Sequence, residues 1–425
     1  MLYLCSMRVL IVNTSERTGG AAVAANRLMK ALNNNGVKAK MLVRDKESDA
    51  LTVVRLPQSP LLRWYFLWER FVVFCRLHFS RKHLFEVDIA NSGFDITNLR
   101  EFQEADIIHL HWINQGMLSL GDIRRILRSG KPVVWTMHDI WPATAICHVT
   151  LGCRNFTTLC RECRLLPGHG SKNDLSTSVW QKKQRLLDDG NIYYVACSRW
   201  LESEAKKSSL LKGQKITSVP NPIDTHIYKK GDQQATRERL GLPKDKQLIL
   251  FASQRVTNEY KGMGYLIEAC QSLKDISQLG VVILGGHAEE VVSQLPFEAY
   301  PLGYVNEEQR IVDVYNAVDV FVLPSLSENL PNTIMEAMAC GVPCVGFKVG
   351  GIPEEIDHRR NGYVAEYRSA EDLAKGIRWI LTEADYEALS QAAVHKVAQN
   401  YSQQSVAMRY LDVYHQALAF NNYRL

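Results

Sequence analysis

Two glutamates eight positions apart carry the most specific chemical signal in the chain. Glu328 and Glu336 stand in SENLPNTIMEA, which follows the apolar run VDVFVLPS. Pro331 suits the first position of a helix there, and the next amides would point out of the helix start, where a phosphate can bind. Glu328 would be free to bind hydroxyl groups, and Glu336 could reach a ribose diol. The spacing alone fits two solvated carboxylates equally well.

Two cations follow an earlier apolar run. Arg255 and Lys261 come after LILFAS (248–253), and we expect a helix from about Gly262. Two fixed positive charges at the carboxyl end of a strand suit a diphosphate leaving group, because they would neutralise the charge that grows as its bond breaks. Two exposed cations on a loop are the commoner explanation of such a pair.

The first half offers two weaker signals. Gly19 and Gly20 follow the first apolar run, and adjacent glycines let the backbone approach a ligand closely. The segment is not G-x-G-x-x-G, which argues against a dinucleotide-dependent dehydrogenase, and a plain strand-to-helix turn explains it about as well. His138 and Asp139 follow the apolar run PVVWTM. A histidine there can bind a sugar hydroxyl or orient an acceptor, although a lone histidine at a strand end is more often structural.

Apolar runs alternate with segments of helical spacing along the whole chain. Continuous apolar strands separated by helices indicate parallel sheets that are covered on both faces. We therefore predict the α/β class, with two Rossmann-like, doubly wound parallel-sheet domains. Such domains bind ligands at the carboxyl ends of their strands, so the site should lie in the cleft between them. The expected strands are 7–13, 37–43, 106–111, 132–137, 191–197, 248–253, 280–286, 318–325 and 343–349, and the expected helices include 20–36, 262–274, 306–317, 332–340 and 369–382.

A chain of 425 residues is long enough for two domains of roughly 200 residues each. We assign 1–217 to an acceptor-side domain and 218–400 to a nucleotide-sugar-binding domain. The proline-containing segment 216–228 would connect them. A last amphipathic helix within 401–425 should pack back on the first domain.

Composition narrows the class of protein. The chain is 46% hydrophobic and 22% charged, as expected of a folded globular protein, and its net charge of +5 gives no reason to expect nucleic acid as a partner. No run approaches the ~18–20 apolar residues that a membrane-spanning helix needs. The N-terminus suggests a strand rather than a secretory signal, so we expect a cytoplasmic protein.

Together these motifs resemble the retaining glycosyltransferases of family 4, which have the GT-B fold. The resemblance rests on Arg255, on Lys261-Gly262 and on the Glu328…Glu336 pair, and extends to the HLHW and PNPID segments, so it covers nearly the whole chain. The chain is also similar to a subgroup from bacterial surface-polysaccharide clusters of the colanic acid type. One departure is Ser253-Gln254 before the arginine, where a glycine is commoner; this affects the expected loop shape rather than the charge.

The resemblance implies a role for each matching residue. The donor would be a nucleotide sugar and the acceptor a glycan or a lipid-linked saccharide, with no catalytic metal or other cofactor required. No carboxylate nucleophile for a double displacement can be identified, so we expect front-face substitution with retention of configuration. The implied catalytic residues are His138, Glu328, Arg255 and Lys261; the implied donor-binding residues are Gly19, Gly20, Arg255, Lys261, Asn329, Leu330, Asn332, Thr333 and Glu336.

Two other classes of protein fit parts of this pattern. A nucleotide-sugar epimerase of GT-B architecture would need acid/base carboxylates in the first domain, where no convincing pair stands. A catalytically silent nucleotide-sugar-binding protein would not need the full set of cations and carboxylates.

Four cysteines follow the His138 strand in the spacing C-x5-C-x6-C-x2-C. Four thiolates could bind a structural zinc ion in tetrahedral geometry. Only one close C-x2-C pair is present, so buried or loop-stabilising thiols are the alternative. The four residues are Cys147, Cys153, Cys160 and Cys163.

The segment 61–83 is dense in aromatic and basic residues. It reads LLRWYFLWERFVVFCRLHFSRKH. A basic, aromatic helix can lie on an anionic membrane surface. Equally, its aromatic residues could enter the core of the first domain.

Overall fold

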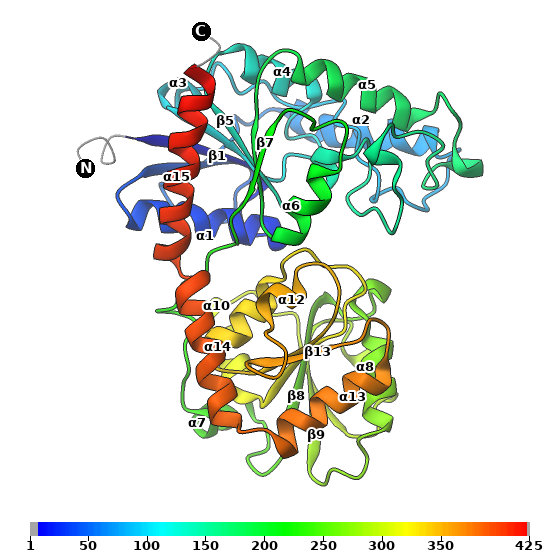
Figure 1. The fold of residues 1–425 in the computed structure, drawn as a ribbon, viewed down its shortest axis with the longest axis vertical. Coiled ribbons are helices and arrows are strands. Elements are labelled where there is room, and N and C mark those ends of the chain that lie inside the picture. Colours follow the sequence, from blue (N-terminus) through cyan, green and yellow to red (C-terminus); the bar gives the residue numbers. More distant parts are fainter. Residues whose placement is uncertain (1–6, 423–425) are drawn as a thin grey trace. The chain divides into compact units, whose positions relative to one another are not determined.

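The computed structural model describes residues 7–422 of the chain, which form two units (Figure 1). The first unit runs to Pro222 and takes in the chain again from Val406, and the second unit is Ile223–Ser405. Each unit is built on one parallel sheet flanked by helices. The predicted fold class, two Rossmann-like parallel-sheet domains, is confirmed.

The first unit contains a seven-stranded sheet in the order β3-β2-β1-β4-β5-β6-β7, in which all neighbouring strands are parallel. Its strands are β1 (Arg8–Ser15), β2 (Lys38–Asp45), β3 (Val53–Arg55), β4 (Ile107–Leu110), β5 (Val133–Met137), β6 (Tyr193–Ala196) and β7 (Lys215–Ser218). Its helices are α1 (Gly20–Asn34), α2 (Pro60–Arg76), α3 (Arg100–Glu104), α4 (Leu120–Arg128), α5 (Leu175–Leu187), α6 (Arg199–Lys206) and most of α15 (Gln403–Asn422).

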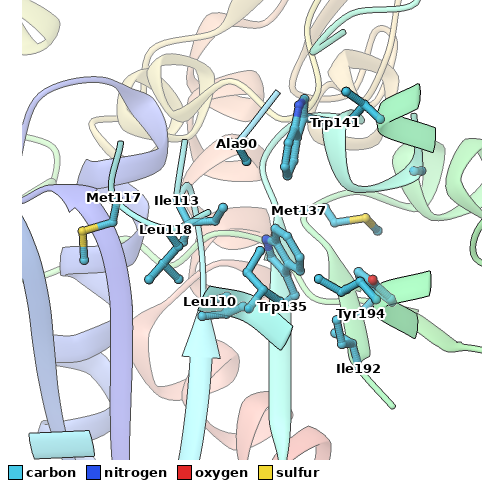
Figure 2. Close-up of a cluster of buried hydrophobic side chains, with 14 of the residues drawn as sticks. Ala90, Leu110, Ile113, Met117, Leu118, Trp135, Met137, Trp141, Ile192 and Tyr194 are labelled. Carbon is cyan, nitrogen blue, oxygen red and sulfur yellow. The ribbon is translucent and has the colours of Figure 1, made fainter. Parts of the chain in front are cut away.

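Both faces of this sheet are covered by apolar side chains. Successive residues of a strand point to opposite faces: Leu10 of β1 belongs to one buried cluster, and Ile11 belongs to the other. Figure 2 shows part of the first cluster, where Trp135 and Tyr194 from neighbouring strands pack together. The second cluster contains residues of α1 and of α15, so the C-terminal helix packs on the same face of the sheet as the first helix.

Three expectations for the first unit need correction. Residues 215–218, expected to begin the connection, form the edge strand β7, whose side chains are half-exposed or exposed and so lack the continuous apolar run of a buried strand. The edge strand β3, which has only three residues, was not predicted either. The helix expected over 61–83 ends at Arg76, because the chain turns at His78 and Phe79, which both have positive φ.

The second unit contains a six-stranded parallel sheet in the order β10-β9-β8-β11-β12-β13. One cluster of buried residues lies between one face of this sheet and its helices. Its strands are β8 (Gln247–Arg255), β9 (Leu279–Gly286), β10 (Glu298–Gly303), β11 (Val320–Leu323), β12 (Cys344–Phe347) and β13 (Gly362–Ala365). Its helices are α7 (Gln233–Leu240), α8 (Met263–Gln271), α9 (Glu289–Val292), α10 (Glu308–Ala317), α11 (Asn332–Ala339), α12 (Ile352–Glu355), α13 (Ala370–Arg378) with a π-helical continuation Trp379–Glu383, and α14 (Tyr386–Asn400).

Two details of the second unit bear on the site. β8 continues to Arg255 rather than ending near Ser253, with an irregular pairing to β9 between Ala252 and Arg255. Helix α11 begins at Asn332, so Pro331 precedes the helix instead of occupying its first position. The neighbouring strands β8, β11 and β12 bring their carboxyl ends to one edge of the sheet, where the motifs of the second half stand.

Candidate active site

An ion pair in the second unit joins the two motifs that the sequence singles out. Lys261 Nζ donates a hydrogen bond to Glu328 Oε1 at 2.5 Å. The Glu328 side chain is 13% exposed and the Lys261 side chain is 32% exposed, so the pair lies at the edge of solvent. An anionic ligand could therefore reach the ammonium group and replace the glutamate as its partner.

A glycine brings the lysine turn against the glutamate loop. Lys261 ends a 3-10 turn, Glu259–Lys261, and Gly262 follows with a φ of +76°. A Cβ atom added at Gly262 would lie 1.8 Å from the carbonyl oxygen of Pro324, so a larger residue would push the two loops apart. The backbone N–H of Leu326 donates to the carbonyl of Tyr260 at 2.8 Å and holds the loops together. Backbone contacts therefore bring Lys261 within reach of Glu328.

A second glycine supports the other side of the glutamate loop. Gly350, after β12, has a φ of +57°, and an added Cβ would lie 1.7 Å from the carbonyl oxygen of Glu328. The Tyr367 hydroxyl donates to the carbonyl of Leu326 at 3.1 Å. The loop that carries Glu328 is thus packed between the turn after β8 and the turn after β12. This packing preorganises the carboxylate.

Arg255 lies at the same edge of the sheet and is exposed. Its Nε donates to Thr257 Oγ1 at 3.0 Å. No carboxylate among the described residues forms an ion pair with it. The guanidinium therefore remains available to a ligand anion, whereas Lys261 already has a carboxylate partner.

The start of α11 holds the remaining residues of the predicted donor set. Asn332 and Thr333 are half-buried in its first turn, and Leu330 is buried, so its side chain faces the core. Glu336 is 8% exposed and accepts a hydrogen bond from the Tyr315 hydroxyl at 3.0 Å. The carboxylate that could bind a ribose is therefore oriented by a side chain of α10.

Glu355 of α12 was not foreseen. Its side chain is fully buried, and neither carboxyl oxygen has a hydrogen-bond partner among the described residues. Burial raises the pKa of Glu355 well above its usual value, and the charge of Glu328 raises it further. The site therefore favours the protonated form of Glu355. The run GGIPEEI does not distinguish it from its neighbour Glu354.

In the first unit, His138 is paired with another histidine. His138 Nε2 and His111 Nδ1 lie 2.9 Å apart, because the two residues follow the adjacent strands β5 and β4. Burial lowers the pKa of His138 to about 4 and that of His111 well below its usual value. Both rings are therefore neutral at pH 7, so His138 can exchange hydrogen bonds with a substrate but brings no positive charge to it.

A third histidine connects this region to the C-terminal helix. His109 Nδ1 lies 2.9 Å from the Tyr414 hydroxyl, and its Nε2 lies 2.8 Å from Thr136 Oγ1. Thr136 in turn lies 2.9 Å from the hydroxyl of Tyr410. Burial lowers the pKa of His109 to about 3. The sequence predicted a packed terminal helix but gave no sign that its tyrosines complete a buried polar row.

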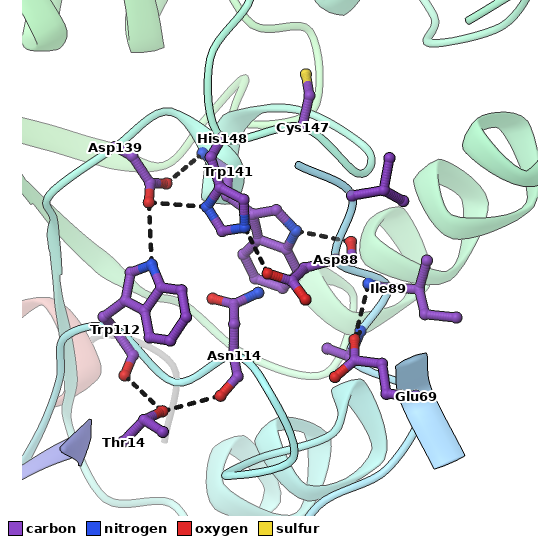
Figure 3. A network of polar contacts seen from close by, with 12 residues as sticks. Thr14, Glu69, Asp88, Ile89, Trp112, Asn114, Asp139, Trp141, Cys147 and His148 are labelled. Carbon is purple, nitrogen blue, oxygen red and sulfur yellow. Dashed lines mark hydrogen bonds and ion pairs between the residues drawn. The ribbon is translucent and has the colours of Figure 1, made fainter. Parts of the chain in front are cut away.

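Beside His138 lies a buried network of charges (Figure 3). His148 Nδ1 lies 2.8 Å from Asp139 Oδ2, and its Nε2 lies 2.6 Å from Asp88 Oδ2. Burial alone would lower the pKa of His148, but the two carboxylates raise it to about 10. Asp139 also accepts hydrogen bonds from Trp112 Nε1 at 3.1 Å and from the backbone N–H of Trp141 at 2.8 Å. An imidazolium between two carboxylates thus fixes the chain that follows His138.

Helix α2 contributes its own charges to this network. Arg70 forms an ion pair with Asp88. Glu69 Oε1 accepts hydrogen bonds from the backbone N–H groups of Ile89 at 2.9 Å and Ala90 at 2.7 Å (Figure 3). Burial raises the pKa of Glu69 to about 6, with Asp88 adding to the effect. The inner side of α2 is therefore held by charge as well as by the apolar packing of Val73.

Lys183 is a further buried cation that the sequence did not indicate. Its Nζ donates to the carbonyls of Trp141 at 2.6 Å and Thr144 at 3.0 Å and lies 3.3 Å from the centroid of a Trp141 ring. Burial lowers its pKa to about 7. In the sequence, Lys183 is recognisable only as a polar residue within an apolar helix face. That pattern does not identify the carbonyl groups of Trp141 and Thr144 as its partners.

Gly19 and Gly20 stand at the same edge of the first sheet as the histidines. Gly19 caps α1 with a φ of +91°, which few other residues tolerate. An added Cβ there would meet no atom within 4 Å, so space is left above the helix start. The predicted site residues thus form two groups: Gly19, Gly20 and His138 in the first unit, and the rest in the second.

The four cysteines of the expected zinc site lie between β5 and α5 as free thiols. Cys160 is buried and the other three are half-buried. In residues 7–422 the structure gathers no three His, Cys, Asp or Glu side chains into a group that could hold a metal ion. The expectation of structural zinc at Cys147, Cys153, Cys160 and Cys163 therefore finds no support in the geometry.

Comparison with known families covers both units. Residues 18–227 match the family model described as Glycosyltransferase Family 4, and residues 232–396 match Glycosyl transferases group 1. The uncharacterized glycosyltransferase MJ1607 of Methanocaldococcus jannaschii is 30% identical over 357 residues, which are 77% of this chain and 89% of that protein. The chain belongs to this family of GT-B glycosyltransferases.

More distant relatives cover less sequence or show the fold alone. The putative teichuronic acid biosynthesis glycosyltransferase TuaC of Bacillus subtilis is 27% identical over 272 residues, 62% of this chain and 67% of that protein. The chain spans only about half the length of several other curated relatives that it matches. The solved structure of Anabaena HepE in complex with UDP-glucose superposes with a TM-score of 0.62 at 16% identity, covering 96% of this chain and 100% of that one.

Proposed function

We propose that the protein is a retaining glycosyltransferase that moves a sugar from a nucleotide-sugar donor to a glycan or lipid-linked acceptor in surface-polysaccharide biosynthesis. The observation that carries the proposal is the Lys261–Glu328 pair at 2.5 Å, held by two glycine turns beside the unpaired Arg255. The UDP-glucose bound to HepE and the pathway named for TuaC support the choice of donor class and pathway.

Donor binding would exchange the partners of the ion pair. The diphosphate would take Lys261 and Arg255 as its cations, and the amides at the start of α11 would bind it further. Glu328, released from the lysine, would then accept hydrogen bonds from hydroxyl groups of the donor sugar. Glu336, oriented by Tyr315, would bind the ribose. Neutral His138 and the Gly19-Gly20 turn would contact the sugar and the acceptor from the first unit.

The transfer step would need little covalent chemistry from the protein. The bond between the anomeric carbon and the phosphate oxygen breaks, and the acceptor oxygen forms its bond to the same face of that carbon. The acceptor proton passes to the departing diphosphate, and the electron pair of the broken bond stays on the phosphate. The two cations stabilise this growing negative charge, and the protein otherwise supplies position.

The test separates binding from transfer. Nucleotide sugars that differ in base and sugar are screened for thermal stabilisation of the full chain, because a bound donor raises the unfolding temperature according to its affinity and concentration. Sugar transfer from the donor that binds is then measured for wild type, for Glu328→Gln and for Glu383→Gln. The last variant is the control, because it makes the same substitution at an exposed glutamate of the same unit.

The proposal expects transfer to fall steeply in Glu328→Gln while the nucleotide still stabilises the protein and the Glu383→Gln control keeps full activity. Unchanged transfer in Glu328→Gln would remove the assigned role of that residue. Nucleotide-sugar binding without transfer in the wild type would favour the silent binding protein. A lipid-linked acceptor would bring the reaction to a membrane surface.

A further inference from the structure

Helix α2 turns charged side chains toward the core and large apolar side chains toward solvent. Its buried positions are Glu69, Arg70 and Val73, two of which are charged. Five of its large apolar residues point outward instead and recur at the three- and four-residue spacing of one helix face. These exposed residues are Leu61 (55% exposed), Trp64 (65%), Leu67 (42%), Trp68 (53%) and Phe71 (55%).

The buried charges keep this face outward. Arg70 is paired with Asp88 and donates to the carbonyls of Leu84 at 2.6 Å and Val87 at 3.1 Å. Glu69 receives two backbone N–H groups from the chain after Asp88. Turning the aromatic face into the core would leave these charges without partners. Exposure of the aromatic residues is therefore a stable property of the folded unit.

Positive charge surrounds the apolar face. Phe79, in the turn after α2, is 70% exposed and lies in the sequence between the exposed cations Arg76 and Arg81. Lys82 and Arg63 are exposed as well, and none of these four cations forms an ion pair among the described residues. The region thus offers apolar side chains together with uncompensated positive charge, which is the complement of an anionic lipid surface.

A basic cavity opens at the start of the helix. It has a volume of about 680 Å³ and is lined by Arg44, Arg55 and Arg63, with Ser59 and Phe66. The one carboxylate in its wall, Asp45, is paired with Arg44 at 2.6 Å. Arg55 and Arg63 are thereby left for an anionic group beside the apolar face.

We propose that the outer face of α2 and the following turn dock on an anionic lipid bilayer. The aromatic and leucine side chains from Leu61 to Phe71, with Phe79, enter the boundary between headgroups and acyl chains. The flanking cations bind lipid phosphates. No helix in the described part of the chain is long and apolar enough to cross a membrane. This inference goes beyond the proposed transfer reaction and does not depend on it.

The test is co-flotation of the full chain with vesicles, without donor or acceptor. We expect wild type to bind vesicles of phosphatidylcholine mixed with phosphatidylglycerol, and to bind pure phosphatidylcholine weakly. Added salt should weaken the binding because it screens the charges. Trp64→Ala with Trp68→Ala should reduce partitioning about tenfold or more, since both indoles leave the interface. Arg76→Gln with Arg81→Gln should weaken binding to anionic vesicles and leave the weak binding to pure phosphatidylcholine unchanged.

The matched control is Leu51→Ala with Leu151→Ala, which removes exposed apolar side chains elsewhere on the same unit. It should bind as wild type does. Equal binding of the tryptophan variant and wild type, or no binding of wild type to anionic vesicles, would overturn the proposal. Light scattering gives a further test of the proposal. If wild type is a dimer and Trp64→Ala with Trp68→Ala makes it a monomer, a second copy of the chain covers this face and the proposal is overturned.

Discussion

The two units share one architecture, but the cations after β8 in the second unit and the charge network around Asp88 in the first unit are held in opposite ways. In the second unit, Arg255 at the end of β8 and Lys261 in the turn that follows stand at the edge of solvent. In the first unit, Asp88 is buried and bound by two cations from different elements, His148 and Arg70. The first of these sites displays charge for a ligand, and the second uses charge to hold its own loops in place.

The comparison has an energetic meaning. A buried charge costs desolvation energy that its partners must offset, so every member of the network depends on the others. An exposed cation costs little to maintain and changes partners easily. Substitutions should therefore mainly affect stability in the first unit and binding in the second.

The largest effect should come from removing the central carboxylate of the network. Asp88→Asn takes from Arg70 its nearest carboxylate and from His148 one of its two carboxylate partners, and we expect it to lower the free energy of unfolding by about 3–5 kcal/mol. Urea denaturation measures the change. Asp189→Asn is the control, because Asp189 pairs with Arg124 and Arg128 at the surface and should matter far less. If both variants lose the same free energy of unfolding, the buried network contributes no more to stability than a surface ion pair does.

The second unit should respond in activity instead. Lys261→Met removes one of the two cations proposed to hold the departing diphosphate, and we expect kcat/KM for transfer to fall about 100-fold. Its unfolding midpoint should stay near that of wild type, because the lysine side chain is one-third exposed. A large loss of stability with unchanged kcat/KM would mean that the pair with Glu328 is structural.

The pH dependence of stability tests the network without altering its carboxylates. The folded chain holds the His148 proton up to a pKa of about 10, whereas the unfolded chain releases it near 6.5. The stabilisation is therefore complete below pH 6.5 and is lost as the pH rises to about 10. Lys183, with its pKa lowered to about 7, titrates in the opposite sense, so the quantity to follow is the difference between wild type and His148→Gln.

We expect this difference in the free energy of unfolding to shrink by about 2 kcal/mol between pH 7 and pH 8.5. Urea melts at each pH measure it. A difference that stays constant over this range would show that His148 is neutral in the folded protein.

The smallest expected effect concerns the C-terminal helix. Tyr414→Phe removes the hydroxyl that contacts His109 and leaves the ring in place, and it should cost about 1 kcal/mol. Thermal unfolding of the full chain measures it. Tyr367→Phe, which removes a hydroxyl at the surface of the second unit, serves as the comparison. If Tyr414→Phe leaves the unfolding temperature unchanged, the contact between Tyr414 and His109 does not contribute to stability.

Local pattern was informative where one segment carries its own signal. The central strands are continuous apolar runs, and they were found to within a few residues. The edge strands β3, β7, β10 and β13 are short and were not predicted, and the side chains of β7 and β10 are all half-exposed or exposed. The Lys261 and Glu328 motifs could be recognised singly, since each stands beside a buried strand. The contact between Lys261 and Glu328 at 2.5 Å could not be predicted, because it depends on the fit of Gly262 and Gly350 against loops far away in the sequence.

By itself the sequence determined the fold class, the family resemblance and the residues of the second unit that could bind a nucleotide sugar, because periodicity and short motifs are local properties. Tertiary structure alone decided which charges are buried together, that Asp88 meets both His148 and Arg70, and that the aromatic face of α2 points to solvent. The physical reason is that burial and pairing arise between segments distant in the chain, and the cost of an unpaired buried charge then decides which face of a helix turns inward.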